Sequence, residues 1–209
     1  MTETVVFYHN PMSRGRRIRW MLEEVGVPYE VRIKDFAKRE HKAADYLAIN
    51  PMGKIPAIVH RGVVVTECDA ICAYLADAFP QARLAPEPGS RERGAYYRWL
   101  FFGAGPVDGA IVNKSLGFEP PAERQGMVGY GTLAYVLNTL EKTVSACNYL
   151  VGDKFSAADL YLGAQLGWGM MFGALEKRPA FEAYWNRIKD RPAAIRARNI
   201  DDALVPKKE

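Results

Sequence analysis

The segment 50–58 reads Asn-Pro-Met-Gly-Lys-Ile-Pro-Ala-Ile and carries the most informative spacing in the chain. Pro56 stands directly before an apolar run, and proline is tolerated there only at a strand edge, a strand start or a special turn. If the Ile55–Pro56 bond is cis, the N–H and C=O of Ile55 point outward, where an extended peptide can pair with them. The alternative is a trans proline that simply starts a strand. Spacing alone favours it, because only about one X–Pro bond in twenty is cis.

The elements around this segment follow from the periodicity of the apolar residues. Four apolar runs indicate strands, and two segments with helical spacing indicate helices. The strands are expected over 5–9, 29–33, 57–60 and 63–66, and the helices over 14–25 and 69–79. The first two strands should be parallel, because a helix connects them. The last two should form an antiparallel hairpin at Arg61-Gly62.

A domain boundary is predicted at 81–89, which holds two prolines, a glycine and mixed charge. The pattern after it is helical throughout. The expected helices cover 92–102, 107–116, 122–146, 157–175, 179–189 and a short 192–198, with a break at 103–106. The sequence therefore predicts an α/β domain over 1–82 with a mixed four-stranded sheet, followed by an all-helical bundle over 89–209.

Composition excludes several classes of protein. The 28 Lys and Arg against 24 Asp and Glu give a net charge of only +4, which does not imply nucleic acid as a partner. The start is polar and acidic, without a secretory signal, and the most apolar stretch, 160–175, is shorter than the roughly 20 residues that span a bilayer. Cys68, Cys72 and Cys147 match neither a zinc knuckle nor a CxxC pair. We expect a cytoplasmic protein with no metal and no membrane partner.

Three motifs together resemble the glutathione S-transferase family. They are Asn50 to Pro56, which matches that family's NPxGxVP element; Glu67-Cys68-Asp69-Ala70-Ile71, which matches its ESxAI element; and Phe155-Ser156-Ala157-Ala158-Asp159 at the start of a late helix. The resemblance covers essentially the whole chain. It implies a thioredoxin-like N-terminal domain, a helical C-terminal domain and a homodimer.

The resemblance also assigns residues to reduced glutathione as co-substrate. Ile55 would bond the cysteinyl backbone, Pro56 would hold the cis bond and Glu67 would meet the γ-glutamyl amino group. Lys54 would reach a glutathione carboxylate, and Lys42 or His41 would be a second cationic contact unless they are plain surface charge. Position 68, usually serine, is Cys68, which is a weaker donor. Either its backbone N–H suffices or affinity for glutathione is reduced.

In this family the thiol-activating residue follows the first strand, within 9–17. Ser13 is the only hydroxyl there, and no tyrosine or cysteine is present. The resemblance thus points to a serine-using class, in which the Ser13 hydroxyl and the helix N-terminus favour the thiolate, the nucleophilic form. Asn10 is the competing donor, ranked second. Ser13 is also placed to cap the helix, and the two roles are compatible.

Four arginines, Arg14, Arg16, Arg17 and Arg19, crowd the first turns of that helix, where the macrodipole disfavours cations. A nearby anion would explain them, and glutathione carries two carboxylates. A solvated face is the simpler interpretation for Arg16 and Arg19, with Arg19 pairing with Glu23.

Two further predictions concern the helical half. In this family the electrophile occupies an apolar pocket, for which Met12, Phe101 and Trp168 are candidates. Ser156 and Asp159 form a capping box with a short acid, and Phe155 is placed to pack against Leu160. The role of that box is folding.

The predicted function is conjugation of activated glutathione to a small hydrophobic electrophile. One alternative is a glutathione-dependent peroxidase, reductase or isomerase on the same fold, since fold does not fix the reaction. Another is a non-catalytic module that carries ligands or docks a partner, which the cysteine at position 68 keeps open.

Overall fold

The computed structural model describes residues 4–205 and divides them into two compact units. The first unit consists of 4–83 and 191–205, and the second of 84–190. We expected domains over 1–82 and 89–209, and those limits stay a prediction for the folding domains. The contacts nevertheless group the last helix, α9 (Pro192–Leu204), with the first unit, because α9 packs along α1 (Gly15–Val25).

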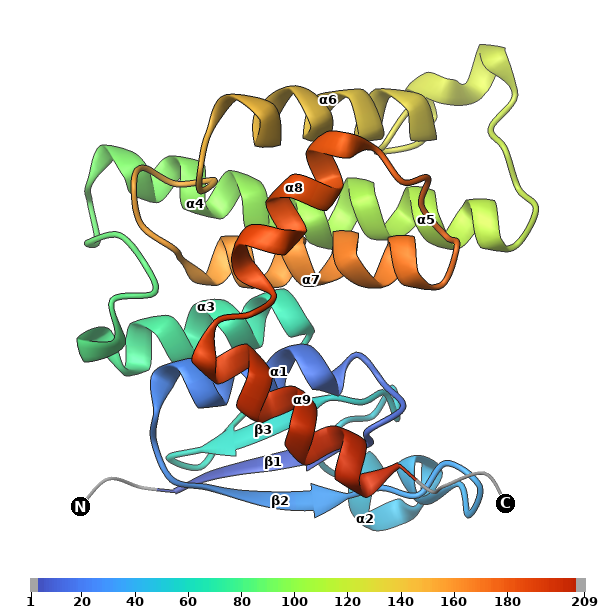
Figure 1. The fold of residues 1–209 in the computed structure, drawn as a ribbon. Coiled ribbons are helices and arrows are strands. Elements are labelled where there is room, and N and C mark those ends of the chain that lie inside the picture. The colour runs from blue at the N-terminus through green and yellow to red at the C-terminus, as the bar shows by residue number, and fades with distance from the viewer. Residues whose placement is uncertain (1–3, 206–209) are drawn as a thin grey trace. The chain divides into compact units, whose positions relative to one another are not determined.

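A four-stranded sheet in the order β2-β1-β3-β4 forms the centre of the first unit (Figure 1). Its strands are β1 (Val5–His9), β2 (Tyr29–Ile33), β3 (Ala57–His60) and β4 (Val63–Thr66). β1 runs parallel to β2 and antiparallel to β3, and β3 forms the hairpin with β4. The predicted strand bounds and both predicted pairings are confirmed, and the sheet is the mixed sheet of a thioredoxin-like domain.

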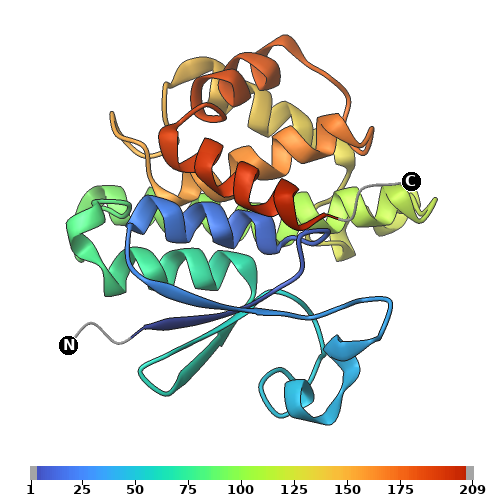
Figure 2. The same ribbon diagram turned by 60° about the horizontal axis from the view of Figure 1, so that its bottom comes forward.

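The helices α1 and α3 (Cys68–Ala78) lie on one face of this sheet, and α9 lies beside α1 (Figures 1 and 2). Their apolar faces make the core, since Ile18, Met21 and Leu75 are fully buried. The charged connection between β2 and β3 holds the short α2 (Ala44–Leu47) and a 3-10 turn, η1 (Glu40–Lys42). Another 3-10 turn, η2 (Pro80–Ala82), follows α3.

The second unit is helical, as predicted. Its elements are α4 (Arg91–Phe102), the π-helical η3 (Gly103–Val107), α5 (Asp108–Ser115), the 3-10 turn η4 (Ala122–Met127), α6 (Leu133–Ala146), α7 (Ala157–Met171) and α8 (Pro179–Ile188). α7 is buried on nearly all sides and packs against both α4 and α8. A helix that is apolar all round is typical of the centre of a bundle.

Four predicted helix limits in the second half of the chain were wrong. The helix expected over 157–175 ends at Met171, shortly before Gly173 at a φ of 72°. The expected break at 103–106 is a wider π turn that joins α4 to α5, and it accommodates Pro106 because the Asp108 N–H donates to the Gly103 carbonyl. The helix expected over 122–146 begins only at Leu133, after Gly131 at a φ of 64°. The short helix expected over 192–198 continues to Leu204, where it stays packed on α1.

The predicted capping box at the start of α7 is confirmed. Asp159 is fully buried, and its Oδ2 accepts from the Ser156 N–H at 2.9 Å and the Ser156 hydroxyl at 2.7 Å. Its Oδ1 accepts from the Leu150 N–H at 2.7 Å and the Tyr184 hydroxyl at 2.6 Å. Burial raises the pKa of this carboxyl, and these four hydrogen bonds act in the opposite direction. Asp159 therefore ties the loop before α7 to α8.

Within residues 4–205, no helix has both the length and the apolar character that crossing a membrane requires. The same residues contain no cluster of three or more His, Cys, Asp or Glu side chains arranged to hold a metal ion.

Candidate functional site

The Ile55–Pro56 bond, which ends the loop before β3, is cis. This confirms the first of the two alternatives, in which Ile55 points its N–H and C=O outward, over a trans proline. Two side chains that precede this bond, one on α2 and one at the start of the loop, fix the loop by hydrogen bonds. The Tyr46 hydroxyl and the Asn50 amide both donate to the Lys54 carbonyl, at 2.5 and 2.9 Å. The Asn50 Oδ1 in turn accepts from the Met52 N–H at 3.1 Å. Asn50 thus fixes the loop from both sides, which explains its place at the start of the motif.

Ile55 keeps its main chain available. Pairing of β3 with β1 begins at Ala57, opposite Tyr8, and within 4–205 the Ile55 N–H and C=O form no hydrogen bond to another backbone group. The residue is half-buried. This edge can therefore pair with an extended peptide, as a strand edge does in β-augmentation.

The junction of β4 and α3 supplies the next part of the site. Glu67 is exposed, and its backbone has a φ of 63° and a ψ of 127°. Residues other than glycine rarely adopt this backbone conformation. Such a conformation costs about 1–3 kcal/mol and is concentrated at functional sites. The motif match singled out Glu67 as a ligand contact, but nothing in the sequence indicated this backbone conformation.

Cys68 begins α3, so its N–H belongs to the first turn, where amides lack partners within the helix. The side chain is 8% exposed, and its Sγ lies 3.9 Å from the Arg14 carbonyl. Burial raises the pKa of the Cys68 thiol to about 11, although Arg17 and Arg14 act to lower it. Cys68 is therefore a buried neutral thiol, and its backbone N–H is the better donor to a ligand.

The predicted cationic contacts border the same loop. Lys42 is exposed, and its Nζ donates to the Met52 carbonyl at 2.8 Å. Lys54 is exposed beside Ile55. His41 is half-buried and lies edge-on to the Phe36 ring, with 4.9 Å between ring centroids. Lys42 and Lys54 thus bring positive charge to the edge that holds Ile55.

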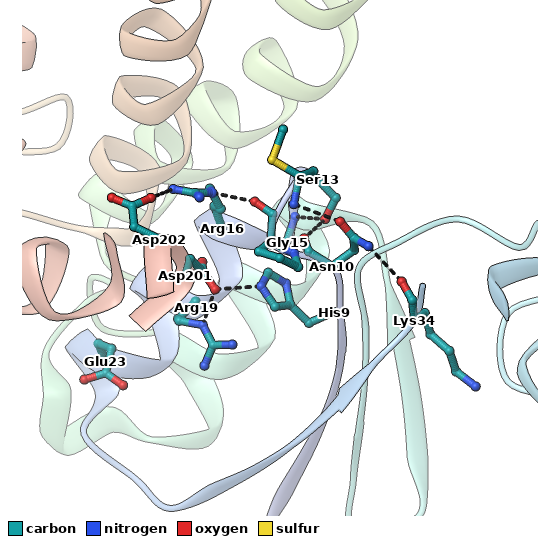
Figure 3. A network of polar contacts seen from close by, with 12 residues as sticks. His9, Asn10, Ser13, Gly15, Arg16, Arg19, Glu23, Lys34, Asp201 and Asp202 are labelled. Atoms are coloured by element: carbon teal, nitrogen blue, oxygen red, sulfur yellow. Dashed lines mark hydrogen bonds and ion pairs between the residues drawn. The ribbon is translucent and has the colours of Figure 1, made fainter. Parts of the chain in front are cut away.

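The turn formed by residues 10–13 links β1 to α1 and carries both candidate thiol activators (Figure 3). Asn10 is buried, and its side chain is occupied twice: Nδ2 donates to the Lys34 carbonyl and Oδ1 accepts from the Met12 N–H, each at 2.8 Å. Ser13 is half-buried. Its hydroxyl donates to the Asn10 carbonyl at 2.7 Å and accepts from the Gly15 N–H at 2.9 Å.

These contacts separate the two candidates. Each side chain makes two hydrogen bonds, but the Asn10 amide is planar and buried, whereas the half-buried Ser13 hydroxyl rotates about a single bond at the start of α1. The expected N-cap at Ser13 was wrong by one residue, because the N-cap of α1 is Arg14, whose side chain forms no capping hydrogen bond. Ser13 still accepts from the Gly15 N–H, the first amide of the helix. This contact uses an oxygen lone pair, so the hydroxyl proton can turn from the Asn10 carbonyl to another acceptor without breaking it.

The arginines on α1 were partly misassigned. The solvated face expected for Arg19 was wrong, because its side chain is 2% exposed, and its Nε donates to Asp201 on α9 at 2.6 Å. Glu23 instead accepts from the Tyr29 hydroxyl and from Arg196. Arg16 is 21% exposed and pairs with Asp202 at 2.6 Å. The anions that Arg16 and Arg19 meet are thus aspartates of this chain.

The candidate electrophile contacts lie in different units. Met12 belongs to the 10–13 turn and is 67% exposed. Phe101 on α4 is 66% exposed, and Trp168 on α7 is half-buried against the Phe172 ring. Their common role therefore stays a prediction.

Sequence reasoning missed one cluster close to this turn. His9 is fully buried at the end of β1, and its Nε2 lies 2.7 Å from the Asp201 Oδ1. The two residues are separated by almost the whole chain, and a histidine that ends an apolar run is usually part of the core. No local pattern could have indicated the pair.

Comparison with known proteins agrees with this architecture. The family model described as "Glutathione S-transferase, N-terminal domain" matches residues 3–77, and the "Glutathione S-transferase, C-terminal domain" model matches 127–192. Glutathione S-transferase F9 of Arabidopsis thaliana is 31% identical over 202 residues, which cover 89% of this chain and 92% of that protein.

Solved structures give the same picture. A glutathione transferase from Methylococcus capsulatus strain Bath has a TM-score of 0.79 and 30% identity, covering 97% of this chain and 100% of that one. A sphingomonad glutathione S-transferase, solved as a complex with glutathione, has a TM-score of 0.76 and 30% identity, covering 94% and 98% of the two chains.

The mixed sheet of the first unit and the helical second unit match the fold of these relatives. The chain belongs to the glutathione S-transferase family.

Proposed function

We propose that this protein binds reduced glutathione along the Ile55 edge, ionises its thiol at Ser13 and conjugates the thiolate to a small hydrophobic electrophile. The observation that carries the proposal is the half-buried Ser13 hydroxyl at the start of α1, beside an Asn10 amide that is buried and bonded to the Lys34 carbonyl and the Met12 N–H.

The recognition step uses groups that the fold leaves available. The Ile55 N–H and C=O pair with the cysteinyl backbone of glutathione, which extends the sheet as a short peptide strand would. The Glu67 carboxylate accepts a hydrogen bond from the γ-glutamyl amino group, and the Cys68 N–H donates one to the γ-glutamyl carboxylate. Lys42 and Lys54 offset the second carboxylate. The sphingomonad relative, solved with glutathione, supports glutathione as the ligand.

The activation step needs only a small free energy. A thiol pKa lowered by about two units corresponds to about 2.7 kcal/mol. The Ser13 proton turns from the Asn10 carbonyl toward the sulfur, where it forms a charge-assisted hydrogen bond, the stronger kind. The N-terminal end of α1 contributes in the same direction, because its dipole favours an anion.

The acceptor for the thiolate is an electrophile with an apolar body. Met12 exposes its thioether beside Ser13, and Phe101 and Trp168 are the proposed contacts from the helical unit. Cys68 is neutral and buried, so a mixed disulfide through it does not compete. We propose further that the protein is a cytoplasmic homodimer of the serine-using class.

An ultraviolet difference titration with reduced glutathione across pH tests the activation step. The wild-type protein should show a saturating thiolate band with an apparent pKa about two units below that of free glutathione, as a thiolate-stabilising site requires. Ser13→Ala should shift this pKa back toward the free value and lower kcat by about 10²-fold, as loss of one donor to an anion does. The dissociation constant for glutathione should change by less than about twofold.

Two variants serve as controls. Ser115→Ala removes another serine hydroxyl that donates to a backbone carbonyl, that of Ile111 at 2.8 Å, and should change neither quantity. Asn10→Ala should loosen the turn and affect the thiol pKa less than Ser13→Ala. If Asn10→Ala has the larger effect, Asn10 is the activator. Glutathione that binds without ionising would indicate a carrier or docking module instead.

A further inference from the structure

Helix α9 contacts residues on both sides of the 10–13 turn through two neighbouring aspartates near its end (Figure 3). Asp201 is 1% exposed, and its Oδ1 accepts from the Arg19 Nε at 2.6 Å and lies 2.7 Å from the His9 Nε2. Asp202 accepts from the Arg16 Nη1 at 2.6 Å. Both aspartates thus act on groups that border the turn.

The Asp202 contact leads directly into the turn. The Arg16 guanidinium donates through Nη1 to Asp202 and through Nε to the Pro11 carbonyl, both at 2.6 Å. A guanidinium is planar and rigid, so two bonds from one group fix its orientation. Loss of the Asp202 carboxylate therefore frees Arg16 and leaves the Pro11 carbonyl with a less constrained donor.

The Asp201 contact acts through an imidazole. Burial lowers the pKa of His9, with Arg19 and Arg16 acting in the same direction and Asp201 against them. The ring is therefore neutral near pH 7, and its Nε2 carries the proton that is donated to Asp201. This contact fixes the tautomer, so that Nδ1 presents a lone pair. The ring is also stacked on Phe7, with 4.7 Å between ring centroids.

The other side of this imidazole faces the start of α1. A Cβ built on Gly15 would lie 2.3 Å from the His9 Nδ1 and 2.9 Å from the Ser13 Oγ. The imidazole and the Ser13 hydroxyl thus both border Gly15, with no room there for a methyl group. Nδ1 is buried and has no hydrogen-bond partner in the described part of the chain. The His9 ring is held in one orientation and packs against the start of α1 beside Ser13.

The rest of α9 is attached to α1 without reaching the turn. Arg196 pairs with Glu23 at 3.0 Å, and Arg191 pairs with Glu24 at 2.6 Å, both toward the end of α1 that is far from Ser13. The Asp201 and Asp202 contacts instead lie beside the residues that flank the 10–13 turn.

We infer that Asp201 and Asp202 are positioning residues for thiol activation. They hold His9 and Arg16, which in turn fix the 10–13 turn so that the Ser13 hydroxyl faces the glutathione sulfur. The inference rests on the proposed function of Ser13 and deepens it, because it assigns the control of that hydroxyl to a helix far away in sequence. Neither aspartate touches the substrate.

A pair of variants separates positioning from general attachment of α9. Asp202→Ala and Arg196→Ala each break one α9–α1 ion pair, and the two altered side chains are similarly exposed, at 57% and 54%. Both variants should lower the melting temperature slightly and equally. Amide hydrogen exchange at Met12, Ser13 and Gly15 should become about fivefold faster in Asp202→Ala only, which is the upper range for one exposed ion pair.

The same pair is then compared in the glutathione titration. Asp202→Ala should raise the apparent pKa of the bound thiol by about half a unit and lower kcat about threefold, with the glutathione dissociation constant within about twofold. Arg196→Ala should match the wild type. Asp201→Asn keeps the shape but removes a buried charge, and its effects should exceed those of Asp202→Ala. If Asp201→Asn does not fold, the exposed pair decides alone.

The outcomes are distinct. Equal exchange rates in Asp202→Ala and Arg196→Ala, or faster exchange with an unchanged thiol pKa, would overturn the positioning role. A wild-type protein that forms no thiolate would instead contradict the proposed function, and amide exchange would still decide whether the aspartates hold the turn.

Discussion

The first unit and the second unit each contain an aspartate that is almost completely buried, but the two carboxylates have different surroundings. Asp159 accepts hydrogen bonds from neutral donors only, two backbone amides and two hydroxyls, and burial raises its pKa. Asp201 meets the Arg19 guanidinium and the His9 imidazole. A buried carboxylate can thus be held by neutral dipoles or by a cation.

The difference also concerns distance along the chain. The partners of Asp159 lie 3 to 25 residues away, whereas those of Asp201 lie 182 and 192 residues away. The nearer set closes a loop and a helix start, which is a folding task. The distant set joins the end of α9 to the residues around Ser13, which is a task for the site. Three tests sharpen or break this contrast.

The largest effect is expected from Asp159→Ala. It leaves four buried donors without their acceptor, and the free energy of unfolding should fall by about 3–5 kcal/mol, since each orphaned polar group costs about 1–3 kcal/mol. Chemical denaturation measures this change. Asp153→Ala, an exposed aspartate in the same loop, should stay within about 0.5 kcal/mol of the wild type.

Glutathione affinity sharpens the same test. Whatever fraction of Asp159→Ala still folds should bind glutathione as the wild type does, because its contacts lie within the second unit. An unchanged melting curve would contradict the capping role, and lost glutathione affinity in folded protein would break the contrast between the two aspartates.

A smaller effect is expected from Gly15→Ala. Its Cβ would lie 2.3 Å from the His9 Nδ1, so either the imidazole or the helix start must shift. Overpacking of this kind costs about 1–3 kcal/mol. The matched control is Gly94→Ala, because Gly94 lies inside α4 with open space around it, and there alanine should stabilise by about 0.4–1 kcal/mol. Equal melting temperatures for the two variants would show that the His9 imidazole moves aside at no cost and is not held in place.

The smallest effect is a pH dependence that belongs to His9. Burial lowers its pKa below the ordinary 6.5, so below pH 6.5 the unfolded chain binds more protons than the folded one. The stabilisation is therefore complete above pH 6.5 and is lost as pH falls through the folded pKa, with a slope of up to about 1.4 kcal/mol per pH unit. Denaturation at several pH values between 5 and 8 should show this slope in the wild type and not in His9→Gln. Identical slopes would mean that His9 titrates as it does in the unfolded chain.

The strands and the two sheet helices were predictable because their signal is local. The strands at 5–9 and 57–60 are continuous apolar runs, and the apolar residues of α1 repeat at helical spacing. The burial of each element can therefore be predicted from its own residues. The π turn at 103–107 was not predictable. Two glycines and a proline there are typical of a break, but the chain stays helical through a π turn in which the Asp108 N–H donates to the Gly103 carbonyl.

The site shows the same division. Pro56 and Glu67 came from motif matches, and Ser13 was chosen as the only hydroxyl after the first strand. The cis bond at Pro56 is confirmed. The assignment of Arg19 to solvent was wrong for a physical reason. An arginine at a helix start has no local partner that discloses its burial, and Asp201 becomes its neighbour only when α9 packs on α1. Long-range charge pairing leaves no periodicity in a single sequence.

The first unit is discontinuous, since α9 follows the whole second unit in the chain. On the ribosome, β1 and α1 therefore emerge with Arg19 and His9 still lacking their carboxylate, and they wait until all of 84–190 has been synthesised. The 10–13 turn, where we propose that the thiol is activated, acquires its final geometry as one of the last events of folding. Partly synthesised or partly folded chains would thus contain Ser13 without the surroundings that we propose make it reactive.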